Sequence, residues 1–154
     1  MATSSSTNFE LDVAEYIEEA FERCGLEART GYDLQTARRS MNIMLAEWAN
    51  RGLNQWTIEQ RTQALTANST DVLVYDALTR MQDADTQVNT LEIPFRFFPC
   101  LTAGLAYYIA MKRAPDRIQL LKTVYEEEFE RAMAEDRDRS AFKVNPQLSY
   151  YKVG

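Results

Sequence analysis

The sequence predicts a mainly α fold of the α+β type, in which a four-helix core carries a small β-hairpin and an extended C-terminal arm. Apolar residues recur every three or four positions over four segments, which together cover about half of the chain. Between the second and third segments the pattern changes to alternation, with the Thr, Val and Tyr enrichment typical of strands. We therefore expect a helical core over residues 1–140, with a β excursion over about 56–82, and an arm over 141–154.

The first predicted helix begins near Asp12 and ends at Gly25. Gly25 followed by Leu26 is a typical helix ending, because glycine adopts a left-handed conformation easily and leucine folds back onto the last turn. The same Gly-Leu pair at 52–53 ends the second predicted helix, so the two helices should form an antiparallel αα-hairpin. The two apolar stripes consist of Val13, Ile17, Ala20, Phe21 and Cys24, and of Leu34, Ala37, Met41, Met44, Leu45 and Trp48.

The sequence leaves two helix starts open. Thr30 and Asp33 have the spacing of a capping box, but Asp33 alone also fits the N-cap of the second helix. The third helix has Pro94 or Pro99 in its first turn, where a missing N–H costs little. After a break at 114–116, the fourth helix should run to near residue 140. The third and fourth stripes consist of Phe98, Leu101, Leu105, Tyr108, Ile109 and Met111, and of Ile118, Leu121, Tyr125, Phe129, Ala132 and Met133.

The β excursion opens at Trp56, and a loop over 66–71 should join its two strands. An isolated two-stranded hairpin is only marginally stable in water. We therefore expect these strands either to lie on the helices or to pair with another chain.

The last segment, residues 141–154, has no helical period, and Pro146 forbids a continuous helix there. Such an apolar segment should be covered, either as an added strand or as an extended peptide in a groove. Its apolar side chains include Phe142, Val144, Leu148, Tyr150 and Tyr151.

The composition lacks the residue types and motifs on which most enzyme active sites depend. The absence of histidine removes the commonest general base and the commonest metal ligand. Cys24 and Cys100 are too far apart for a CxxC motif, and we interpret both as small buried apolar residues, with an isolated disulfide left open. Because nucleophile and phosphate-loop motifs are also missing, we predict no catalytic residue, no cofactor and no metal site.

Charge and hydropathy argue against two classes of partner, nucleic acid and membranes. The net charge of −6 argues against a broad electrostatic grip on nucleic acid. The N-terminal residues lack the basic and apolar regions of a signal peptide, and the most apolar run, over 100–111, is too short to span a bilayer. We therefore expect a soluble protein, made in the cytoplasm, that does not contact membranes.

Three clusters have a structural interpretation and a functional alternative. We interpret the glutamates at 126–130 as a solvated helix face, which in a ring would line a channel and repel DNA. Arg38 and Arg39 do not make a DNA site alone, and we expect one of them to pair with acids of a neighbouring helix. Trp48 and Trp56 bracket the corner after the second helix, and we interpret them as core, with an interface as the alternative.

Two blocks of sequence resemble the head-to-tail adaptor proteins, or connectors, of tailed bacteriophages. The first is GYDLQTARRSMNIMLAEWANRGLNQWTIEQ, over 31–60. The second is IPFRFFPCLTAGLAYYIAMKRAP, over 93–115, followed by LLKTVYEEEFERAMAEDRDRS, over 120–140. The blocks follow the family's order and cover most of the chain. One departure is the short link between the strands, so either this hairpin is short or residues are missing at 68–69.

The resemblance implies a structural virion protein with a helical core and a β excursion. It implies a homododecameric ring beneath the portal protein, at the head-tail junction or neck of the virion, which continues the DNA channel without binding DNA specifically. The lower surface would meet a downstream tail or nozzle protein. The C-terminal arm of such adaptors reaches the portal, so the resemblance implies portal binding by Phe142, Val144, Leu148, Tyr150 and Tyr151.

The alternative is a small cytoplasmic regulatory protein that is helical and binds a protein partner or DNA. Affinity for portal rings would separate the two hypotheses. Oligomeric state alone would not separate them, because an adaptor of this kind can stay monomeric until it meets the portal.

Overall fold

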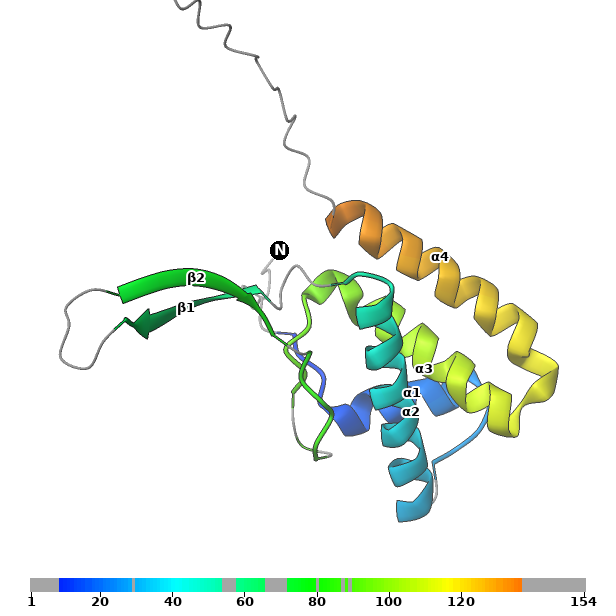
Figure 1. The fold of residues 1–154 in the computed structure, drawn as a ribbon. Coiled ribbons are helices and arrows are strands. Elements are labelled where there is room, and N and C mark those ends of the chain that lie inside the picture. The colour runs from blue at the N-terminus through cyan, green and yellow to red at the C-terminus, as the bar shows by residue number, and fades with distance from the viewer. Residues whose placement is uncertain are drawn as a thin grey trace, which may run out of the picture.

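The computed structural model describes residues 9–28, 30–53, 58–65, 72–79, 81–86, 88 and 90–136. Within these residues the fold is mainly helical with one antiparallel hairpin, which confirms the predicted class (Figure 1). The elements are α1 (Val13–Arg23), α2 (Gly31–Asn50), β1 (Ile58–Ala64), β2 (Val72–Leu78), η2 (Phe95–Phe97), α3 (Phe98–Arg113), η3 (Pro115–Arg117) and α4 (Ile118–Asp136).

Short-range hydrogen bonds set the helix starts. Asp12 caps α1 in a reciprocal capping box with Glu15. Thr30 caps α2, because its hydroxyl accepts from the Asp33 N–H at 3.2 Å while the Asp33 carboxylate accepts from the Thr30 N–H at 3.3 Å. The Thr30 start is therefore the correct one of the two alternatives.

Both Gly-Leu pairs end their helices as the sequence predicts. Gly25 has φ 69° and Gly52 has φ 88°, in the left-handed region that glycine reaches without strain. The N–H of Leu26 donates to the carbonyl of Phe21 at 2.9 Å, which is the bond that closes a Schellman motif. The corresponding bond from Leu53 closes α2 at 3.2 Å.

The turn η2 leads directly into α3. Pro94 precedes η2, and Pro99 lies in the first turn of α3, where its missing N–H removes no helical hydrogen bond. At the other end, α4 is described as far as Asp136, so the predicted end near residue 140 lies outside the described residues.

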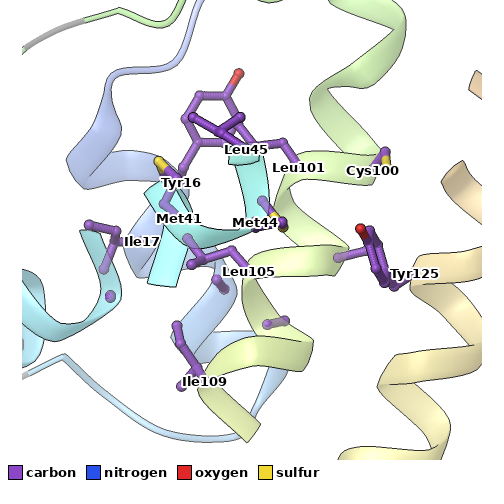
Figure 2. Close-up of a cluster of buried hydrophobic side chains, with 14 of the residues drawn as sticks. Tyr16, Ile17, Met41, Met44, Leu45, Cys100, Leu101, Leu105, Ile109 and Tyr125 are labelled. Carbon is purple, nitrogen blue, oxygen red and sulfur yellow. The ribbon is translucent and has the colours of Figure 1, made fainter. Parts of the chain in front are cut away.

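Helix α3 occupies the centre of the helical core and packs against α1, α2 and α4 (Figure 1). A helix surrounded in this way must be apolar on nearly all sides, and every residue of α3 from Cys100 to Ala106 is buried. Figure 2 shows side chains from all four helices meeting around α3. They include Tyr16, Ile17, Met41, Met44, Leu45, Leu101, Leu105, Ile109 and Tyr125.

Small residues of α3 allow the close approach that this packing needs, and Gly104 is the clearest case. A Cβ added at Gly104 would lie 2.8 Å from a ring carbon of Tyr125, and it would also collide with the sulfur of Met44. Tyr125 comes from α4 and Met44 from α2. Glycine at this position therefore lets two neighbouring helices pack onto α3 at the same level.

The hairpin extends away from the helical core as a two-stranded ribbon (Figure 1). Its strands pair antiparallel, with Ile58 opposite Leu78 and Ala64 opposite Val72. All seven side chains of β1 are exposed, and in β2 only Ala77 is partly buried. Of the two placements expected for these strands, the first is wrong, because the ribbon does not lie on the helices.

Candidate interaction surfaces

Trp48 lies in the core, where hydrogen bonds satisfy its polar atom. Its side chain is fully buried, and its indole N–H donates to the hydroxyl of Tyr125 at 2.9 Å. One oxygen of Glu47 accepts hydrogen bonds from Tyr108 at 2.9 Å and from Tyr125 at 3.4 Å. Burial and the bond to Glu47 raise the pKa of Tyr108 to about 12, and burial raises the pKa of Tyr125. These phenols stay protonated at neutral pH and form part of the hydrogen-bonded core around Trp48.

Arg51 connects the end of α2 to α4. Its guanidinium lies 2.6 Å from Glu47 and 2.9 Å from Glu126, and its central carbon lies 4.5 Å from the ring centroid of Phe129. The hydrogen bond from Arg51 lowers the pKa of the Glu126 carboxyl. Arginine suits this position, because its planar group can pair with carboxylates and lie over an aromatic ring at once.

Arg38 contacts the loop segment 81–86. It donates to the backbone carbonyl of Asp85 at 2.6 Å, and among the described residues neither Arg38 nor Arg39 forms an ion pair. The expected pairing of one of them with acids of a neighbouring helix is therefore wrong in this part of the chain. The Asn42 side chain holds the same segment, accepting from the Ala84 N–H at 2.8 Å and donating to its carbonyl at 3.3 Å. This part of α2 therefore anchors the chain as it returns from the hairpin.

The acidic residues of α4 do not converge on a pocket. Glu127 and Glu130 are exposed, while Glu126 pairs with Arg51 and Glu128 pairs with Arg131 at 2.9 Å. In the described part of the chain, no three His, Cys, Asp or Glu side chains come together to hold a metal ion.

Both cysteines are buried and free, as the apolar interpretation predicts. The Cys24 thiol donates to the carbonyl of Ala106 at 3.2 Å, and burial raises the pKa of both thiols. A buried thiol with a raised pKa is a poor nucleophile.

The first surface available to partners is the β1–β2 ribbon. By alternation, Val72, Val74 and Leu78 lie on one face, and Leu73 and Tyr75 lie on the other. These five side chains are 41 to 63 % exposed. The neighbouring strand β1 carries mostly polar side chains, such as those at 59–61. Clustered exposed apolar side chains are typical of association sites, so both faces of β2 are candidate interaction surfaces.

The second surface is a groove of about 490 Å³ between α1 and the start of α3, named here the α1 groove. Its wall contains the exposed rings of Phe9 and Phe95, which are 62 % and 69 % exposed. Glutamates of α1 form its rim, and Glu19 there pairs with Arg23 at 2.9 Å. The full lining is Phe9, Leu11, Glu15, Glu18, Glu19, Glu22, Arg23, Phe95, Phe98, Pro99 and Thr102.

The structure brings few of the residues singled out in the sequence to these surfaces. Trp48 is in the core. Trp56, the possible gap at 68–69 and the five arm residues Phe142, Val144, Leu148, Tyr150 and Tyr151 lie outside the described residues.

The α1 groove, in contrast, was not predicted. A signal for it exists in the sequence, because Glu15, Glu18, Glu19 and Glu22 follow helical spacing and so share one face of α1. The contribution of Phe95 depends on tertiary packing and leaves no such local signal.

Comparison of the chain with models of protein families, with curated proteins and with solved structures finds no match. Within the described residues, no helix combines the length and the apolarity needed to cross a membrane.

Proposed function

We propose that the protein is a structural component of a tailed-phage virion, a head-to-tail adaptor that forms a ring beneath the portal. The observation that carries this proposal is the β1–β2 ribbon, whose apolar side chains are exposed on both faces. In a monomer these apolar side chains keep 41 to 63 % of their surface in water, so folding gains only part of the free energy that their burial could supply. Association with further copies or with another protein would bury them.

The sequence resemblance specifies the kind of assembly. Its blocks fall on α2, on α3 and on α4, which are the helices that pack around the centre of the core. In the proposed ring, these helices form the wall and lateral contacts between copies close it. The arm over 141–154 docks on the portal, and the exposed Glu127 and Glu130 give the channel a negative lining past which DNA moves.

The proposed mechanism is geometric and involves no reaction. The ring would match the symmetry of its copies to the portal above and present a lower surface to the tail or nozzle protein. The protein would be made in the host cytoplasm and act in the virion.

The test is co-sedimentation of the full chain with purified portal rings from the phage that encodes it. We expect the wild-type chain to pellet with the rings and the double variant Tyr150→Asp/Tyr151→Asp to remain in the supernatant, because charged groups oppose burial of the arm. Leu120→Asp is the matched control, since it also adds charge at an exposed apolar side chain but lies on α4.

Equal pelleting of the arm variant and the wild type would remove the arm from the interface. A wild-type chain that stays a monomer or dimer and has no affinity for portal, measured by mass photometry, would instead favour a regulatory protein.

A further inference from the structure

We infer that the α1 groove binds the C-terminal segment of the same chain, residues 141–154, in the free protein. This contact does not depend on the proposed function, because it concerns the isolated chain before any ring forms. Three observations support it: the charge of the groove, the aromatic side chains on its wall, and the length of the chain that follows α4.

The charges of the groove and of the segment are opposite. Four glutamates and one arginine of α1 line the groove. Glu18 and Glu22 are exposed and form no ion pair with any described residue, so both carboxylates are available to a cation. Residues 141–154 contain Lys143 and Lys152 and no acidic residue.

The apolar chemistry also matches. Phe95 is largely exposed, and its ring centroid lies 5.3 Å from that of Phe98, which gives the groove an aromatic wall. Residues 141–154 supply Phe142 and the pair at 150–151, which can pack against such a wall in tilted or stacked arrangements. A peptide that combines lysines with aromatic rings fits an acidic rim above an aromatic wall better than a purely charged or purely apolar peptide.

The link between α4 and the segment is long enough to reach the groove. Helix α4 contacts η2, and Phe95 of the aromatic wall is the first residue of η2. When extended, residues 137–154 span at most about 60 Å, which is ample for a segment that follows a helix in contact with η2. Because the segment is tethered, its effective concentration at the groove exceeds that of another copy in dilute solution.

A direct test compares backbone amide exchange in full-length chains at low concentration. Glu18→Lys/Glu22→Lys should speed exchange of residues 141–154 by about fivefold, since two attractive contacts become repulsive. Phe95→Ser should produce a loss of protection in the same segment by removing part of the aromatic wall. Circular dichroism melting of each variant checks that the helical core is intact.

The matched control is Glu127→Lys/Glu130→Lys, which makes the same charge change on the exposed face of α4 and should leave exchange of the segment unchanged. Equal exchange in the wild type and in the Glu18/Glu22 variant would overturn the inference. Protection of residues 141–154 that disappears on dilution would also overturn it, because the groove would then bind the segment of a second copy. Portal protein is absent from the experiment, so failure here and failure of the adaptor proposal are separate results.

Discussion

At Gly104, the backbone of α3 comes so close to α2 and α4 that a methyl group does not fit. We expect Gly104→Ala to destabilise the protein by about 1–3 kcal/mol, which is typical of overpacking in a closed core. Urea unfolding followed by circular dichroism would measure this change.

Gly31→Ala is the control for Gly104→Ala. A Cβ at Gly31, in the first turn of α2, meets nothing within 4 Å, so this substitution should be neutral or slightly stabilising. Equal losses at both positions would contradict the prediction, because the contacts of a Cβ with Tyr125 and Met44 exist only at Gly104.

At several single residues, local chemistry was enough to predict the backbone conformation. The Gly-Leu endings depend on the left-handed freedom of glycine, which the sequence shows directly. The choice between Thr30 and Asp33 as the cap of α2 was not predictable, because the two residues cap reciprocally and either hydrogen bond alone fits the pattern. The bonds of Arg51 to Glu126 and of Trp48 to Tyr125 join residues more than seventy positions apart, and no local period encodes them.

Among the elements, α2 and α4 are joined by the ion pair of Arg51 and Glu126. Because Glu126 is titratable, the contribution of this pair to the free energy of unfolding should depend on pH. Because the pKa of Glu126 is lowered in the folded state, its contribution to stability is present above the ordinary glutamate pKa of about 4.3 and is lost as the pH falls below it. Glu126→Gln should therefore lower the free energy of unfolding at pH 7 by about 0.2–1 kcal/mol, the range for a partly exposed pair, and have little effect near pH 3.

Urea unfolding of the wild type and Glu126→Gln at both pH values measures the difference. Glu127→Gln, at the exposed neighbouring position, should match the wild type at both. A deficit of Glu126→Gln that persists unchanged at low pH would show that packing, and not charge, holds the two helices there.

The helical elements could be predicted because each has an apolar stripe that the core covers. The placement of the hairpin could not, since alternating side chains in β1 and β2 show that strands form but not what covers them. Helix α3 is a related case, because its stripe predicts one buried face whereas its neighbours bury every residue from Cys100 to Ala106.

For the whole molecule, the exposed ribbon predicts that some substitutions will change association without changing the stability of the helical core. We expect Leu73→Ser/Tyr75→Ser to leave the stability of the helical core within about 0.5 kcal/mol, because both side chains are exposed on a ribbon that does not pack on the helices (Figure 1). The same variant should self-associate less than the wild type when sedimentation velocity is measured over a range of concentrations.

Thr62→Ser is the control, since it changes an exposed polar side chain of β1 in the same ribbon. If the double variant instead unfolded with the helices at much lower urea, the ribbon would belong to the core and would not be a separate association surface.

The central position of α3 also determines how the molecule loses its structure. Each of the other three helices packs on α3, so opening α3 removes the main support of all of them at once. The helical core should therefore open as one cooperative unit, with its slowest amide exchange in α3, where burial is deepest. The ribbon shares little of this burial, so its strands should open while the helices stay intact and should exchange their amides faster than α3.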